Sequence, residues 1–174
     1  MTETKRTEPW LRGTVRDVPA VGRGVLHALQ LGEEDLTSWC GELDAQELNS
    51  RPGGLASVAF QIRHISRSVD RLLSYAEGRR LDEVQMAALK AEMDGHADPD
   101  EVFAELNNTF ERATRRVREL ASEDLEAVRV VGHKKLPTTL GGLLVHVADH
   151  TQRHVGQAIT TAKIVRGSKS ERAK

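Results

Sequence analysis

Three histidines recur at intervals of four residues near the end of the chain: His146, His150 and His154. Around them, residues 140–165 carry apolar side chains at the spacings of three and four that predict a helix with one buried stripe. Continuing the stripe through the middle of this segment reaches His150 and His154, where aliphatic side chains would be expected. Residues four apart lie above one another on a helix, so both rings can direct a nitrogen at one point. This HxxxH spacing is suited to binding a metal ion.

A lone inward-facing histidine has a simpler explanation, because it is usually a core residue whose ring is hydrogen-bonded. Two on one buried face are harder to satisfy, since each unpaired group costs roughly 1–3 kcal/mol, and a shared cation removes that cost. His146, His150 and His154 cannot all bind one ion. Eight residues of helix separate His146 from His154 by roughly 12 Å, whereas a metal–nitrogen bond is only about 2 Å long. Its place beside the stripe makes His146 a pocket wall, a group behind the ligands or a surface residue.

A third ligand is predicted on another helix, expected from about Leu55 to Ala76. Beside the apolar stripe of this helix runs a polar line, which comprises Ser57, Gln61, His64 and Ser68. A polar line beside the core suggests a helix face that is directed into a water-filled cavity. Taken alone, His64 would be an ordinary histidine at the edge of the core. Together with the HxxxH pair, it is the natural third metal ligand. Three neutral ligands with one open position are typical of catalytic rather than structural zinc.

The elements that must position these residues are four amphipathic helices. Their expected ranges are 21–43, 55–76, 98–120 and 138–165. A long crossover over residues 77–98, with a short helix in it, joins the second helix to the third, and an irregular connection covers residues 122–137. We expect an extended lead-in over residues 1–20, a bundle over 21–166 and a disordered tail over 167–174. The fold class is therefore all-α, a four-helix bundle with ligands pointing inward from two helices.

The amino-acid composition limits the classes of partner that we expect this protein to bind. The formal net charge of -1 gives no overall attraction to nucleic acid or to an anionic membrane. The single cysteine, Cys40, excludes an internal disulfide and fits a reducing compartment. No apolar run approaches the roughly 20 residues that span a bilayer, and the first residues lack the apolar segment of a signal peptide. We therefore expect a cytoplasmic protein with no membrane or nucleic-acid partner.

Two metal motifs are absent: no glutamate precedes a histidine by three residues, as a di-iron bundle requires, and there is no HExxH. The segments SVAFQIRHISRSVDRLLSYAEG and LLVHVADHTQRHVGQAI instead resemble the DinB/YfiT-like superfamily of metalloenzymes, over most of residues 26–165. His64 matches the family's histidine on the second helix. The family pattern HxxxHxGQ matches His150, His154, Gly156 and Gln157. The resemblance implies an up-down-down-up bundle, a histidine triad on one divalent ion and a possible homodimer.

The resemblance also implies a reaction, since characterised relatives include transferases for thiols such as bacillithiol or mycothiol and a thiol-dependent isomerase. We expect zinc or nickel on the triad to hold a small thiol as thiolate for attack on an electrophile. The polar groups expected around the pocket are Gln61, Ser68, His146 and Gln157. One alternative is a non-catalytic protein in which the ion braces two helices. Another is metal-dependent hydrolysis, for which only Asp70 or Asp149 offers a carboxylate base.

Overall fold

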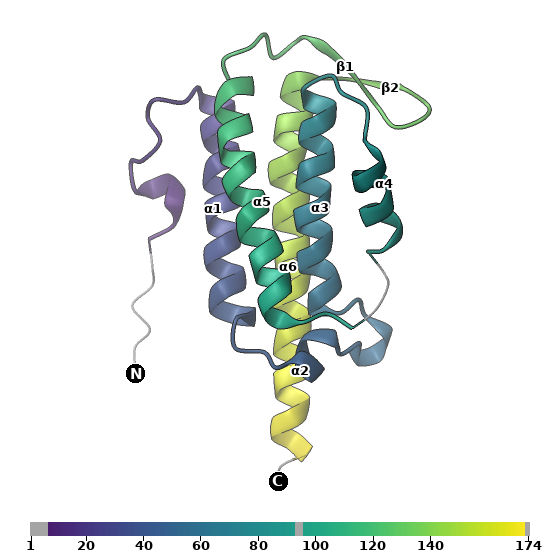
Figure 1. Ribbon diagram of the computed structural model, residues 1–174. Helices are drawn as coiled ribbons and strands as arrows, with labels where there is room; N and C mark the ends of the chain where they lie inside the picture. Colours follow the sequence, from purple (N-terminus) through teal and green to yellow (C-terminus); the bar gives the residue numbers. More distant parts are fainter. Residues whose placement is uncertain (1–6, 93–95, 173–174) are drawn as a thin grey trace.

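Four long helices packed side by side form the body of the protein (Figure 1). The structure, a computed structural model, describes residues 7–92 and 96–172. Its elements are η1 (Pro9–Leu11), α1 (Ala20–Cys40), α2 (Ala45–Asn49), η2 (Pro52–Gly54), α3 (Val58–Ala76), α4 (Glu83–Lys90), α5 (Pro99–Leu120), β1 (Val128–Val131), β2 (Leu136–Thr139) and α6 (Leu140–Arg172). The long helices are α1, α3, α5 and α6, which confirms the predicted four-helix bundle.

The order of directions in the bundle follows from one long connection. The segment containing α4 runs back along the outside of the bundle, so α5 begins at the same end as α3 and lies parallel to it (Figure 1). The helix α1 enters antiparallel to α3, and α6 returns antiparallel to α5, as in the expected up-down-down-up arrangement. Both α5 and α6 pack against α1 and against α3. Thus α3 and α6, which carry the three candidate ligands, are direct neighbours.

One continuous apolar core joins the four stripes. Fully buried side chains come from every long helix, and the largest include Leu29, Leu36, Ile62, Ile65, Leu73, Leu106, Leu140 and Leu144. Burying each of these contributes roughly 1.5–3 kcal/mol relative to leaving it in water. The amphipathic pattern of the sequence therefore accounts for the core.

The starts of α3, α5 and α6 are set by side-chain caps. Ser57 accepts a hydrogen bond from the backbone N–H of Phe60 at 3.2 Å, so α3 begins one residue after Ser57 rather than near Leu55 as predicted. Asp98 caps α5 at the predicted place. Thr139 Oγ1 accepts from the third residue of α6 at 3.1 Å, one residue beyond the predicted start. These caps fix where along each helix the polar residues fall.

The connection expected to be irregular over residues 122–137 instead contains a β-hairpin. The strands β1 and β2 pair antiparallel, with Val131 opposite Leu136. The turn between them places Gly132 and Lys135 in the left-handed region, at φ 71° and 51°. Arg129 Nε donates to the carbonyl of Ala76 at 2.5 Å, so the hairpin satisfies an orphan carbonyl at the end of α3. The sequence pattern missed this element because each strand has only four residues.

The two ends of the chain also differ from expectation. The helix α6 continues to Arg172 rather than stopping near Val165, so the backbone of residues 167–172 is helical where a disordered tail was predicted. Near the other end of the chain, His27 is only 9% exposed, because the segment before α1 lies over it and brings Thr14 Oγ1 to 3.5 Å from its Nε2. Trp10 in that segment is 60% exposed. The predictions for residues 1–6 and 173–174 lie outside the described residues.

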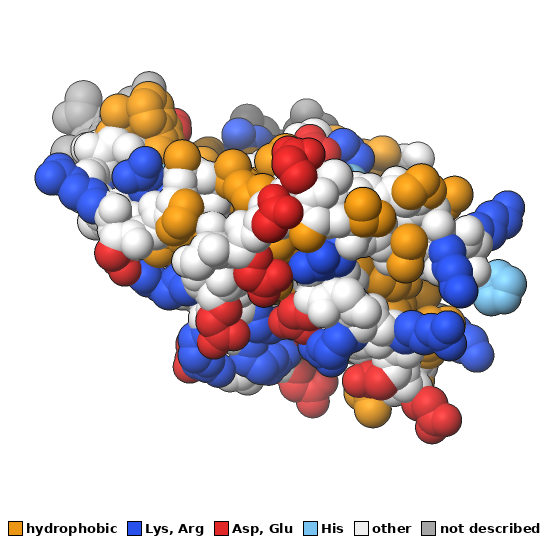
Figure 2. Space-filling view, turned by 90° about the horizontal axis from the view of Figure 1, so that it is seen from above, with side chains coloured by type: hydrophobic (Ala, Val, Ile, Leu, Met, Phe, Trp, Pro, Cys, Tyr) orange, Lys and Arg blue, Asp and Glu red, His pale blue; other side chains and the backbone are white. Residues whose placement is uncertain are grey.

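The surface shows no single dominant charge at the hairpin end of the bundle. Acidic and basic side chains are interspersed there, with hydrophobic ones between them (Figure 2). The exposed hydrophobic residues of the hairpin include Val128, Val130 and Leu136. Among the described residues, no helix combines the length and the apolar character needed to cross a membrane.

The fold predicts opposite effects at two glycines of α1. A Cβ at Gly22 would lie 2.3 Å from the Cβ of Ala121, so α1 and the end of α5 could not keep their separation. We expect Gly22→Ala to lower the free energy of unfolding by about 1–3 kcal/mol. A Cβ at Gly24 meets nothing within 4 Å, so Gly24→Ala should raise that free energy by about 0.5–1 kcal/mol. Urea denaturation measures both, and equal effects of the two changes would contradict the close approach.

Candidate metal centre

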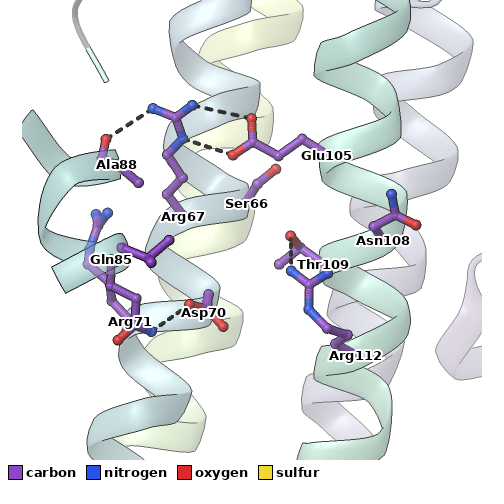
Figure 3. Close-up of a pocket in the computed structure, with 11 residues that line it drawn as sticks. Ser66, Arg67, Asp70, Arg71, Gln85, Ala88, Glu105, Asn108, Thr109 and Arg112 are labelled. Atoms are coloured by element: carbon purple, nitrogen blue, oxygen red, sulfur yellow. Dashed lines mark hydrogen bonds and ion pairs between the residues drawn. The ribbon is translucent and has the colours of Figure 1, made fainter. Parts of the chain in front are cut away.

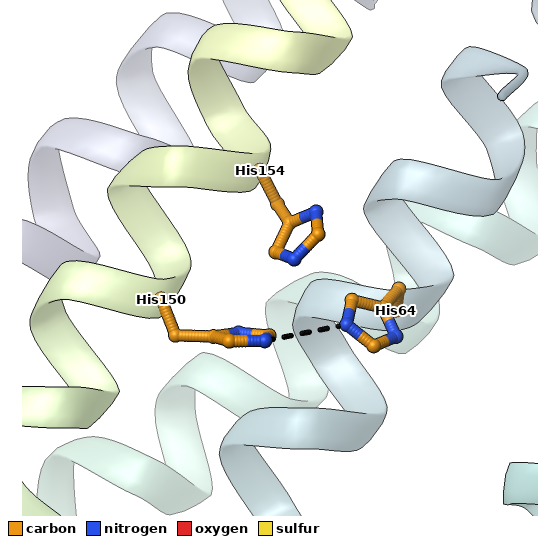
Figure 4. A group of neighbouring side chains, drawn as sticks. All are labelled: His64, His150 and His154. Atoms are coloured by element: carbon orange, nitrogen blue, oxygen red, sulfur yellow. Dashed lines mark hydrogen bonds between the residues drawn. The ribbon is translucent and has the colours of Figure 1, made fainter. Parts of the chain in front are cut away.

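Three histidines from two helices meet inside the bundle. His64 comes from the middle of α3, and His150 and His154 lie one turn apart on the facing side of α6 (Figure 4). One ring nitrogen from each residue lies within 4.8 Å of the other two. The ring centroids of His64 are 5.0 Å from His150 and 4.4 Å from His154. The structure therefore brings together the three residues that the sequence proposed as ligands.

Two of these rings are oriented by acceptor oxygens behind them. Glu92 Oε2 lies 2.8 Å from His64 Nδ1, and Gln61 Oε1 lies 2.7 Å from His154 Nδ1. Carboxylate and amide oxygens can only accept, so each Nδ1 must carry the proton. In the neutral ring the other nitrogen, Nε2, is then left with a free lone pair.

Ser68 gives the third ring the same tautomer. Its hydroxyl donates to the carbonyl oxygen of His64, which uses its single proton. The hydroxyl oxygen lies 3.4 Å from His150 Nδ1 and can accept from it. All three histidines are thus arranged with Nδ1 as a donor to the protein and Nε2 directed into the cluster.

The Nε2 atoms that face one another in the cluster would be stabilised by a positive charge between them. The Nε2 atoms of His64 and His150 are 3.3 Å apart, so one can donate a hydrogen bond to the other only when it carries a ring proton, and with both protons on Nδ1 the two lone pairs face and repel each other (Figure 4). Two nitrogen ligands on one tetrahedral zinc ion with bonds of about 2.0–2.1 Å lie about 3.3 Å apart. The donor set therefore fits a metal ion held by the three imidazoles.

The electrostatics of the cluster favour the neutral form of the two rings on α6, the form in which histidine binds a metal. Burial, together with the neighbouring His154 and His64, lowers the pKa of His150 to about 4. Burial and the neighbouring His64 also lower the pKa of His154. Burial raises the pKa of Glu92, but hydrogen bonds from His64 and Arg71 outweigh it and leave that pKa below its usual value.

Two residues at this site, Glu92 and Arg71, were not predicted from the sequence. Glu92 lies in the crossover, is 6% exposed and bonds both His64 and Arg71. No pattern in the crossover marks Glu92. Arg71, however, continues the polar line of α3 beyond His64 and Ser68 at the same alternating spacing of four and three. That continuation was a signal that could have identified Arg71.

The remaining predicted residues lie at varying distances from the cluster. His146 is exposed beside His150, with ring centroids 5.4 Å apart, and its Nδ1 is 3.7 Å from Asp149. Gln157, three residues after His154 on α6, is also exposed. Asp70 lines a separate pocket of about 330 Å³ between α3, α4 and α5 (Figure 3). Asp70 also forms an ion pair with Arg116.

The lowered pKa values predict an acid-sensitive metal-free protein. In the unfolded chain His150 binds a proton near pH 6.5, but in the folded protein only near pH 4. Between these values the unfolded state binds more protons, so the free energy of unfolding falls as the pH falls. Each such histidine contributes a slope of up to about 1.4 kcal/mol per pH unit. Urea titrations from pH 7 to pH 4 measure this slope. It should flatten in His150→Gln and remain in His96→Gln, which changes an exposed loop residue.

Comparisons with known proteins identify the family and the fold. A search of curated proteins found no match. A solved structure, YfiT from Bacillus subtilis, has a TM-score of 0.60 and 19% sequence identity, over 82% of this chain and 86% of that one. It is described as a probable metal-dependent hydrolase with an unusual four-helix bundle topology. The family model of the DinB superfamily matches residues 28–158, a range that includes α3 and the three histidines. The chain therefore belongs to the DinB superfamily.

Proposed function

We propose that this protein is a metal-dependent enzyme in which His64, His150 and His154 hold one divalent ion, zinc or nickel. We further propose that it activates a low-molecular-weight thiol for transfer to an electrophilic carbon. The observation that carries the proposal is the convergence of three Nε2 lone pairs, each on a ring whose Nδ1 is held by an oxygen acceptor. When bound, the ion would supply an open coordination position that stabilises a thiolate.

The surroundings of the triad support a site that a small molecule can enter. Across residues 7–92 and 96–172, no carboxylate or thiol joins the three histidines as a fourth potential ligand. Gln61 and Ser68 are buried, while His146 and Gln157 are exposed on α6. A substrate would therefore approach from the side of the two exposed residues. In the transfer, the thiolate sulfur bonds to the electrophilic carbon and the leaving group departs with its electron pair.

Hydrolysis is the second candidate, favoured by the likeness to YfiT, which is described as a probable hydrolase. It requires a general base beside the open position. Asp70 is bonded to Gln85 and Arg116 outside the triad. Asp149 is half-exposed and paired with Arg153. Under the hydrolysis hypothesis, His146 is therefore the side chain that would accept a proton from water. Thiol transfer does not require a strong base at this position.

Metal analysis of untagged protein tests the site directly. We expect about one equivalent of zinc or nickel in the wild type and a loss of at least tenfold in affinity in His64→Ala, His150→Ala and His154→Ala. His146→Ala is the matched control on α6 and should keep the metal. Retention of the metal by His150→Ala would refute the triad.

The reaction class is tested on the same metal-loaded protein. Bacillithiol, mycothiol and glutathione with a chromogenic alkylating electrophile test transfer, and a chromogenic ester without thiol tests hydrolysis. Transfer that is lost in His154→Ala supports the proposal. Ester cleavage that falls in His146→Ala would support hydrolysis instead. A loaded protein with neither activity, and a large drop in melting temperature on chelation, would indicate a bracing role for the ion.

A further inference from the structure

Glu92 enters the candidate site from behind and uses both carboxylate oxygens there. Its Oε2 accepts from His64 Nδ1 at 2.8 Å, and its Oε1 accepts from Nη1 of Arg71. Glu92 is 6% exposed and Arg71 is 9% exposed. A buried carboxylate between an arginine and an imidazole can accept but not donate, so it admits only the tautomer of His64 with the proton on Nδ1.

The way the crossover is attached shows that Glu92 is not brought there by apolar packing. No residue of α4 is buried. The segment is held on α3 by polar contacts. Gln85 donates to Asp70 at 2.5 Å, and Arg67 donates to the carbonyl of Ala88 at 3.0 Å (Figure 3). Gln85 also donates to Ser74 at 2.9 Å. Of these attachments, only the Glu92 pair touches a histidine of the triad.

The other two histidines are oriented by residues of α3 itself. Gln61 and Ser68 lie one turn on either side of His64 on the same helix, and α3 is held rigidly by the core. His64 alone depends on a residue from a different and polar-bound segment. This difference makes His64 the ligand whose geometry can be changed from outside the bundle.

We propose that Glu92, held by Arg71, is a positioning residue that fixes the tautomer and the direction of His64 and thereby couples docking of the crossover segment 83–92 to metal affinity. The proposal rests on the proposed function, since it assigns a regulating contact to the same metal site. Carboxylates behind a ligating imidazole typically change metal affinity by 10–100-fold. Coupling is reciprocal, so bound metal must also stabilise the docked crossover.

The tautomer can be measured without any metal. Nitrogen-15 NMR of the metal-free protein should show His64 protonated at Nδ1 in the wild type and a mixture of tautomers in Glu92→Ala. Glu92→Gln retains an oxygen that can accept from Nδ1, so it should keep the wild-type tautomer. An unchanged His64 spectrum in Glu92→Ala would overturn the proposal, and circular dichroism establishes that each variant is folded.

Metal affinity, measured by competition with a chromophoric chelator, tests whether Glu92 couples docking of the crossover to metal binding. We expect zinc to bind roughly 10–100-fold more weakly to Glu92→Ala, with a smaller loss in Glu92→Gln and in Arg71→Met. Asp70→Asn loosens the attachment of α4 without touching a histidine, and Glu105→Gln breaks the Arg67 pair, so by the coupling both should weaken zinc binding and should add no further loss to Glu92→Ala. Glu111→Gln breaks only the pair with Arg115 on α5 and is the control that should bind zinc as the wild type does. Wild-type zinc affinity in both docking variants, or an equal further loss in the Glu92→Ala background, would overturn the coupling through Glu92.

Amide hydrogen exchange tests the reverse effect, in which bound zinc stabilises the docked crossover. Zinc should slow amide exchange in residues 83–92 of the wild type and leave that exchange unchanged in Glu92→Ala. Equal slowing in both proteins would contradict the coupling through Glu92. A wild type that binds no metal would refute the proposed function and the coupling to affinity, whereas the tautomer measurement would still decide whether Glu92 fixes His64.

Discussion

The packing of α3 against α6 is the contact on which the candidate site depends. Ile62 and Ile65 on α3, and Leu144 and Val147 on α6, are fully buried around the histidines. Because protein interiors are close-packed and resist compression, these side chains set the separation of the helices. Their burial, roughly 1.5–3 kcal/mol each, offsets the repulsion between facing imidazole nitrogens. The apolar core thus holds the donor atoms at a spacing that suits an ion.

The bundle topology explains why a residue of the crossover reaches this site. A short loop can join only antiparallel neighbours, so the parallel pair α3 and α5 requires a segment that travels the length of the bundle (Figure 1). That segment passes along α3, on the side where Arg71 and His64 project. Since its attachments are polar, its docking is less strongly favoured than that of the bundle helices. The topology therefore places a weakly held segment behind one ligand only.

The helices and the triad were predictable because they leave periodic signals. Apolar residues at spacings of three and four predicted four helices. The same spacing placed His150 and His154 on the apolar stripe of the last helix. Glu92 was not predictable, since its partner His64 is 28 residues away and the crossover between them carries no repeat. The burial of His27 also leaves no periodic signal, because the segment that covers this residue is irregular. The hairpin strands, of four residues each, were too short for their alternation to outweigh Pro137.

The charge balance behind the ligands bears on the chemistry of the open position. A buried ion pair contributes little net stability by itself, so the pairing of Glu92 with Arg71 is poorly explained as a device for stability. Its effect is instead to orient His64 while adding no net charge, because the carboxylate and the guanidinium cancel. If the three neutral imidazoles held a divalent ion, as proposed above, the charge of that ion would remain uncompensated. An anionic partner such as a thiolate or a hydroxide would then be favoured at the open position, whereas a carboxylate ligand would have neutralised part of that charge in advance.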